Sequence, residues 1–438
     1  MLRGLSIHSG PLALAGALWP PFCDLPPWPG GGPRGETGGN SSRAGASSGG
    51  GGAQTGGGGA SSGTAGSAGD GGAEPEPGDP VLGCSAAEWP SQAQLVPLPP
   101  VEFDDLAGQW DLRKLSANGE VVIADYVVDE DLYSEPEGHR PIFWNGAAWQ
   151  WVDAETLGIP TAVSCDGSVI AGRRSHLDGF IKTANTPLVV LPGEEPWAAI
   201  PADISADGTC IGGNLTTVQE GPGSGQTRPV LWTSGGDATL LEPPAPRTLR
   251  HLRYDGSLLA GHRNICAGQK FCDALAWLFV SPIPFEETLY PDMPWSVMSS
   301  DLSTSTGASL PPGFHWGDGM HEVAIFRSPD QFTEFPCPTP DECEAVAISS
   351  RGNIVLVNRL YGENPPTAYV WTADRGFQDI VALLAADGVP FQELTFTAVD
   401  MSDDGRVLLG SGGIIHEDGE VEWRAFRVLL PRRVYESP

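Results

Sequence analysis

The sequence predicts an all-β protein, specifically a seven-bladed β-propeller of four-stranded antiparallel blades. Three observations favour this fold: a composition rich in turn residues, a hairpin motif that recurs along the chain, and an extra strand ahead of the first repeat. The 438 residues include 58 Gly and 41 Pro, but only 18% are charged. Such a composition suits many short strands joined by turns and suits long helices poorly.

The clearest copy of the repeat is Ala202–Gly213, followed by Arg228–Thr233. Two short apolar runs flank Asp207-Gly208, and this pattern predicts a β-hairpin with a type I′ turn, in which both central residues take positive φ. A third strand containing tryptophan follows. Because a unit of this size cannot bury its apolar face alone, the copies must stack or close into a ring.

Seven copies of this hairpin follow one another. The turn glycine, which is leucine in the fifth copy, stands at Gly119, Gly167, Gly208, Gly256, Leu302, Gly352 and Gly405. Successive separations are 48, 41, 48, 46, 50 and 53 residues, within the range of propeller blades. In four copies the third strand carries a bulky tryptophan that we expect to pack against the next blade. These residues are Trp144, Trp232, Trp277 and Trp371.

Fourth strands are predicted at Pro187–Pro192 and Ala238–Pro243. In the sixth copy the corresponding stretch, Gln378–Ala386, is more typical of a short amphipathic helix, ended by Asp387-Gly388. The seventh copy leaves too little chain for a fourth strand of its own.

A strand-like segment at Ala93–Pro99 precedes the first repeat. We expect it to pair with the last blade, because this pairing would tie the two ends of the repeat domain and remove an open sheet edge. An open row of hairpins, the alternative, leaves this segment without a partner.

The repeat domain is expected over residues 92–431, after two segments of different character. Residues 1–29 carry a weak signal for export, with one short apolar run bounded by prolines that cannot span a bilayer as a helix. Residues 30–80 are almost entirely Gly, Ser, Ala and Thr and are predicted to be a disordered tether. Plain secretion and a lipid anchor, at Cys23 or Cys84, both stay open.

The formal net charge of −31 removes any electrostatic case for binding nucleic acid or an anionic membrane surface, which are themselves negatively charged. An export signal followed by a tether indicates display outside the cell or at the surface of a bacterium. The expected partners are therefore proteins or glycans of the cell envelope or exterior.

Two cysteine pairs lie close in sequence, Cys266 with Cys272 and Cys337 with Cys343. We expect both to form disulfides that hold surface loops, which favours an oxidising compartment. A zinc site of His262 with the first pair is the weaker alternative, because the five-residue spacer is longer than the usual two to four.

Cys165 and Cys210 lie in the hairpins of neighbouring copies. We interpret them as small buried apolar side chains and not as reactive thiols.

The repeats resemble those of the bacterial extracellular HAF family, whose unit combines an Ala-x-x-Ile-Ser-x-Asp-Gly-x-Val-x-x-Gly hairpin with a His-Ala-Phe-x-Trp strand. Ala202–Gly213 and Ala398–Gly410 match the hairpin, whereas Arg228–Thr233 and Thr367–Thr372 keep Trp-Thr without the histidine. The resemblance covers residues 92–431. It implies a cell-envelope or exterior setting and supplies no catalytic residues.

The turn carboxylates raise a calcium hypothesis, because Asp166, Asp207, Asp255 and Asp404 recur at equivalent positions. Each copy offers one or two carboxylates where calcium asks for six to eight oxygens, so local hydrogen bonding in the turn is the favoured interpretation. The densest cluster is Asp400, Asp403 and Asp404. Gly221–Thr227 resembles a phosphate loop but lacks its lysine.

We therefore identify no catalytic, cofactor-binding or metal-binding residues. The first hypothesis is a non-enzymatic scaffold that binds a protein or glycan through its longest connections, at residues 127–139, 214–227, 262–272 and 281–295, with Trp197, Trp295, Trp316 and Trp423 as candidate contact residues. The alternative is an extracellular hydrolase or lyase that uses carboxylates gathered at the propeller channel; propellers host both kinds of function.

Overall fold

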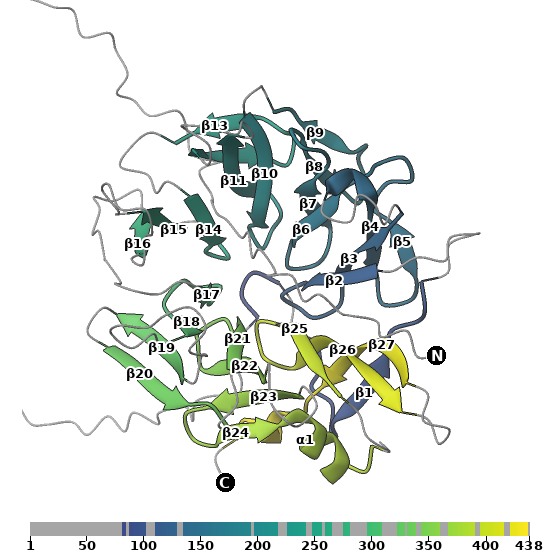
Figure 1. Cartoon of the computed structure of the whole chain (residues 1–438), viewed down its shortest axis with the longest axis vertical. Helices are drawn as coiled ribbons and strands as arrows, with labels where there is room; N and C mark the ends of the chain where they lie inside the picture. The colour runs from purple at the N-terminus through teal and green to yellow at the C-terminus, as the bar shows by residue number, and fades with distance from the viewer. Residues whose placement is uncertain are drawn as a thin grey trace, which may run out of the picture. The chain divides into compact units, whose positions relative to one another are not determined.

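The computed structural model (Figure 1) describes part of the chain, and all statements below refer to that part. The described residues are 81–84, 87–101, 110–128, 135–193, 197–217, 226–241, 248–255, 259–264, 275–280, 296–308, 322–328, 331–338, 343–359, 367–389, 395–415 and 421–436. The proposed export segment and tether lie outside these ranges. No helix among the described residues is long and apolar enough to cross a membrane.

The described strands form seven antiparallel sheets in chain order. The first three are β2 (Trp110–Leu115), β3 (Val122–Val127), β4 (His139–Trp144) and β5 (Trp149–Trp151); β6 (Ile159–Val163), β7 (Val169–Arg173), β8 (Gly179–Thr183) and β9 (Val189–Leu191); and β10 (Trp197–Ile204), β11 (Cys210–Thr217), β12 (Thr227–Thr233) and β13 (Ala238–Leu240). A 3₁₀ turn, η3 (Pro136–Gly138), precedes β4.

The remaining sheets repeat this order. They are β14 (Thr248–Leu252), β15 (Leu259–Asn264) and β16 (Leu275–Val280); β17 (Ser296–Met298), β18 (Ser305–Ala308), β19 (Glu322–Ser328) and β20 (Gln331–Pro336); β21 (Cys343–Ile348), β22 (Ile354–Arg359), β23 (Thr367–Thr372) and β24 (Gly376–Asp379); and β25 (Thr397–Met401), β26 (Val407–Ile415) and β27 (Val421–Leu429) with β1 (Gln94–Pro97). A second 3₁₀ turn, η4 (Arg432–Val434), follows β27.

In the turns that the structure describes, the first and second strands of a sheet are joined at the recurrent hairpin, but the turn is not the expected type I′. In the turn of β6 and β7, Gly167 has φ 77° and the preceding Asp166 does not have positive φ. The Gly167 amide donates to the Ser164 carbonyl at 3.0 Å. The turn therefore spans four residues, and only its last position needs glycine. Leu302 takes this position in the fifth copy, with φ 57°.

Backbone hydrogen bonds join each hairpin turn to the next. They run through all seven sheets and return to the first. The donor amides and acceptor carbonyls are Asn118 to Cys165, Cys165 to Ala206, Ala206 to Tyr254, Tyr254 to Ser300, Asp301 to Ser350, Ser350 to Asp403 and Asp403 to Ala117, at 2.8–3.3 Å.

The segment before the repeats pairs with the last sheet, as the strand pattern predicted. β1 lies antiparallel to β27, with Gln94 opposite Leu429 and Pro97 opposite Phe426 (Figure 1). The Leu98 amide extends this pairing by donating to the Ala425 carbonyl at 2.9 Å. The last sheet thus gains its fourth strand from the opposite end of the domain.

Predicted fourth strands are present as β9 and β13. The prediction for the sixth copy is only half right, because strand β24 precedes helix α1 (Ile380–Ala386). The Asp379 side chain accepts from the Ala382 amide at 3.0 Å and so starts the helix at the point where the strand ends. Gly388 follows the helix with φ 77°, in agreement with the predicted end.

The apolar core lies between neighbouring sheets. One cluster joins Leu98, which follows β1, to the first sheet and the last sheet, with Leu98, Val122, Trp144 and Leu409 all buried. Trp232 belongs to an equivalent cluster between the second and third sheets, and Trp371 to one that joins the fifth and sixth. The side chain of Trp277 lies outside the described part.

We predict that Leu98→Ala lowers the free energy of unfolding by about 2–4 kcal/mol, because the leucine is 4% exposed and its removal leaves a cavity between β1, the first sheet and the last sheet. Urea titration with the disulfides intact measures this. Gln94→Ala, at the start of β1 and exposed, is the control and should change stability by about 0.5 kcal/mol or less. Equal effects of the two changes would show that β1 contributes little to the core.

A candidate functional site at the hairpin ends of the first strands

Three charged residues occupy the same position in different copies. Lys114, Asp203 and Asp400 each precede the hairpin serine by two residues, in the first strands of the first, third and seventh sheets. A β-bulge lies immediately before each of them. Because a bulge redirects the side chain of the strand, the shared bulge gives the three side chains a common placement.

These side chains meet across the sheets. Lys114 Nζ lies 3.3 Å from Asp203 Oδ1, with 35% and 17% of the respective side chains exposed. Burial alone would lower the pKa of Lys114, but Asp203 and Asp400 outweigh it and raise the pKa. Burial raises the pKa of Asp203 and of Asp400, and Lys114 opposes both shifts. Lys114 is therefore a cation at neutral pH and cannot act as a base there.

Both carboxylates are also backbone acceptors. Asp203 accepts from the Ile204 amide at 3.1 Å and from the Leu252 amide of the next sheet at 3.3 Å. Asp400 accepts from the Met401 amide at 2.9 Å and from the Leu115 amide of the first sheet at 2.8 Å. Each carboxylate thus links its own sheet to the next one.

The segment at residues 81–84 lies against the hairpin turns. Cys84 forms a disulfide with Cys165 in the turn of the second sheet, and the Leu82 amide bonds to the Asp403 carboxylate of the seventh. Gly83 fits closely beside Ala206 in the third sheet, where a Cβ on the glycine would overlap the alanine Cβ. The start of the domain is therefore fixed to turns of three different sheets.

The turn carboxylates act within their turns. Asp166 Oδ1 accepts from Ser164 Oγ and from the Ser168 amide, both at 2.9 Å. Asp207 and Asp404 make the equivalent bonds. Serine then completes the turn, since Ser164 Oγ accepts from the Val169 amide at 3.0 Å. These contacts agree with the turn interpretation and leave the calcium hypothesis without support in the described turns.

The interpretation of the two single cysteines was half right: Cys165 and Cys210 are buried, at 2% and 0% exposed, but both are disulfide-bonded. The partner of Cys165 is Cys84. In this state the Cys84 sulfur is not available for a lipid. Cys337 and Cys343 form a disulfide, whereas Cys266 and Cys272 lie outside the described residues.

The opposite end of the sheets carries aromatic and arginine side chains. In an antiparallel sheet, the connections from second to third strand lie opposite the first hairpin. There the Arg228 guanidinium lies 4.2 Å from the Trp197 ring centre, and the Arg140 guanidinium 5.5 Å from that of Trp151. Trp423 in β27 is 59% exposed. Trp295 and Trp316 lie outside the described residues.

A buried charge cluster in the first sheet was not anticipated. Asp125, fully buried, contacts the Arg113 guanidinium and His139 Nδ1. Because His139 is 1% exposed, a substrate cannot reach it, and the cluster fixes β2, β3 and the start of β4 together. From the alternation of polar residues in these strands alone, a buried charge cluster cannot be distinguished from charges on the surface.

No protein-family model matches the sequence, and a search of curated proteins found no match. The HAF resemblance therefore rests on the repeat motif. Among solved structures, the β-propeller domain of the trilobed protease from Pyrococcus furiosus is 12% identical, with a TM-score of 0.49, over 76% of this chain and 99% of that domain.

An acylaminoacyl peptidase from Pyrococcus horikoshii is also 12% identical, with a TM-score of 0.49, over 72% of this chain and 51% of the peptidase. TolB from Acinetobacter baumannii is 13% identical, with a TM-score of 0.37, over 62% of this chain and 63% of TolB. The chain thus spans about half of that peptidase and less than two thirds of TolB. We take no function from these distant similarities.

We predict that stability depends on pH through Asp403. Burial raises the pKa of Asp403 to about 7, well above its value in an unfolded chain. The folded state therefore holds the extra proton between about pH 4 and 7, so its stability falls as the pH rises through that window, by up to about 4 kcal/mol. Asp403→Asn should reduce this fall and leave the part that comes from other buried carboxylates such as Asp203 and Asp400; urea titration at pH 4.5, 6.0 and 7.5 measures it.

Asp166→Asn is the matched control. Burial acts to raise the pKa of Asp166, but the hydrogen bonds from Ser168 and Ser164 lower it overall, so this change should leave the fall in stability intact. Identical pH profiles for the parent and Asp403→Asn would contradict the assignment.

Proposed function

We propose that this chain is an exported, non-enzymatic β-propeller that binds a protein or glycan through the end opposite the Asp-Gly hairpins. In this proposal the seven sheets are blades of a closed ring. The hydrogen bonds that run from turn to turn and return to the first sheet support it, as does the pairing of β1 with β27. Residues 1–29 would direct export and residues 30–80 would act as the tether.

The placement outside the cytoplasm rests on cysteine chemistry. The disulfides Cys84–Cys165 and Cys337–Cys343 form and persist in oxidising compartments. A lipid on Cys23 stays part of the proposal.

A scaffold accounts for the charged residues at the hairpin end better than an enzyme does. Asp203 and Asp400 each accept two backbone amides, so their oxygens are engaged in joining sheets. Lys114 remains protonated beside them. A hydrolase or lyase needs an accessible group that accepts or donates a proton near pH 7. Lys114 is a cation there, and Asp403, with a pKa of about 7, is only 7% exposed and hydrogen-bonded to Ser300 and Leu82.

The observation that carries the proposal is the exposure of Trp423. Large apolar side chains on a soluble surface mark contact sites when they gather with arginine. Trp423 is 59% exposed in the longest hairpin, β26–β27, and is followed by exposed Arg424. Trp197 and Arg228 lie at the same end of the third sheet. Tryptophan with arginine suits either a protein surface or the faces of sugar rings.

We predict that Trp423→Ala weakens ligand binding by roughly tenfold or more, as expected for an aromatic contact at the centre of an interface. Full-length oxidised protein would be screened against a glycan array and an envelope-protein extract, and the affinity of any saturable ligand measured for the parent and the variant. Leu240→Ala is the matched control, since Leu240 is also exposed, at 51%, but lies in the fourth strand β13.

The same screen includes glycosidase, esterase and peptidase substrates. If the protein turns over a substrate and Asp203→Asn abolishes this turnover while circular dichroism shows intact folding, the scaffold proposal is wrong and the enzyme alternative is favoured. Equal loss of binding in Trp423→Ala and Leu240→Ala would place the contact elsewhere.

A further inference from the structure

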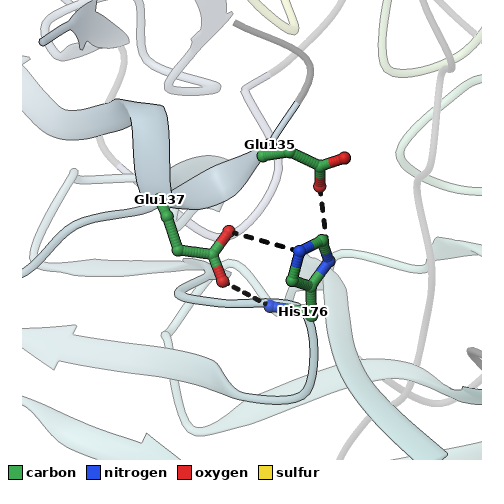
Figure 2. A group of neighbouring side chains, drawn as sticks. All are labelled: Glu135, Glu137 and His176. Atoms are coloured by element: carbon green, nitrogen blue, oxygen red, sulfur yellow. Dashed lines mark hydrogen bonds and ion pairs between the residues drawn. The ribbon is translucent and has the colours of Figure 1, made fainter. Parts of the chain in front are cut away.

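Two connections at the end opposite the Asp-Gly hairpins bring three metal-ligating side chains together (Figure 2). Glu135 and Glu137 belong to the connection between β3 and β4, and His176 to the turn between β7 and β8. One ligand atom from each residue lies within 4.8 Å of the other two. The group therefore joins the first sheet to the second.

Local structure fixes the backbone that carries both acidic side chains. Glu135 caps the 3₁₀ turn η3, in which Pro136 fixes the backbone and the Gly138 amide donates to the Glu135 carbonyl at 3.0 Å. The Gly138 carbonyl in turn accepts from the Val128 amide at 2.8 Å. With Pro136 between them, the two glutamates are thus fixed on a short, braced segment.

The His176 turn is equally well defined. The Arg174 and Ser175 amides both donate to the Asp178 carbonyl, at 2.7 and 3.1 Å, and Ser175 Oγ accepts from the Asp178 amide at 3.0 Å. The His176 imidazole is left at the tip of this turn, 59% exposed. The exposure leaves room for a ligand beside the ring.

Glu137 uses its two oxygens differently. Oε1 accepts from the His176 amide at 2.9 Å and so attaches the turn to the neighbouring sheet. Oε2 is buried, has no hydrogen-bond partner, and faces His176 Nε2 at 4.0 Å. On the other side of the ring, Glu135 Oε2 lies 3.3 Å from Nδ1. An oxygen without a hydrogen bond thus faces an imidazole beyond hydrogen-bonding distance, and such an arrangement is costly without a cation.

We propose that Glu135, Glu137 and His176 bind a divalent transition-metal ion of the zinc class. Two carboxylates and one imidazole form a donor set that suits zinc, whereas calcium prefers oxygen alone. Ligand atoms around tetrahedral zinc lie roughly 3.3 Å apart, given bonds of about 2.0 Å. The group needs to contract only modestly from 4.8 Å to reach this geometry, and the exposed His176 ring can provide the movement.

Arg173 lies near enough to this group to interact electrostatically with both glutamates. Its Nε donates to the Ser175 carbonyl at 3.2 Å, and burial lowers its pKa although both glutamates act to raise it. Among the described contacts it forms no ion pair with either glutamate. Arg173 therefore offsets part of the negative charge without filling the position between the three ligands.

A metal at this position would fix the connection of the first sheet to the turn of the second. Three protein ligands leave a fourth coordination position, which water or a donor group of a partner can occupy. This inference does not depend on the proposed binding function.

The test measures zinc binding by the full-length oxidised protein after treatment with a chelator. Isothermal titration with Zn²⁺ should reveal one site that is lost, or weakened by roughly tenfold or more, in His176→Ala and in Glu135→Gln. Zn²⁺ should also raise the melting temperature of the parent but not of these variants, and Ca²⁺ should do neither. In the described region none of the cysteines carries a free thiol that would compete.

Glu155→Gln is the matched control. Glu155 is exposed and lies in the connection between β5 and β6, and it is not one of the three proposed ligands. Binding of Zn²⁺ with the same affinity and stoichiometry in the parent, Glu155→Gln and His176→Ala would overturn the proposal. Loss of binding in all three variants would overturn it too, since it would indicate a diffuse effect of negative charge. His176→Gln provides a second variant if the alanine form proves unstable.

Discussion

The hydrogen bonds that join successive hairpin turns are the constraint on which the rest of the structure depends. Each turn must present a backbone amide or carbonyl sideways to its neighbour, and it can do so only if its other polar groups are satisfied internally. The Ser-x-Asp-Gly motif meets this need: serine and aspartate bond within the turn, and glycine closes it with positive φ. The motif is therefore explained by sheet-to-sheet bonding alone.

The second position of the motif is free of that constraint, because only its backbone is used. It is occupied by Cys165, Ser300, Ser350 and Asp403 in different copies, and two of these attach the segment at residues 81–84. The position directly after the bulge is similarly open, and Lys114, Asp203 and Asp400 use it to join sheets. Residue types thus vary among the copies where the turn does not use the side chain, and the described contacts at these positions join sheets or attach residues 81–84.

Local chemistry predicted the hairpins, the third strands, two fourth strands (β9 and β13) and the pairing of Ala93–Pro99 with the last sheet. It failed where long-range contacts decide. Asp-Gly alone suggests type I′, but the serine at the start of the turn supplies bonds that favour a four-residue turn. The Cys84–Cys165 pair spans 81 residues, and no local pattern indicates it. In the sixth copy, the capping oxygen of Asp379 allows strand and helix to follow one another directly.

Neither the pair Lys114 and Asp203 nor the group Glu135, Glu137 and His176 is contiguous in sequence. Lys114 and Asp203 are separated by 89 residues, yet they stand at the same position of the first and third copies. Glu137 and His176 are 39 residues apart, close to the repeat length, on equivalent connections of adjacent copies. A repeat protein places equivalent positions of neighbouring copies side by side. The acidic pair Glu135 and Glu137 thus faces His176 because they lie on equivalent connections of adjacent copies. A search for contiguous motifs cannot find such a pair, whereas aligning the copies with one another can.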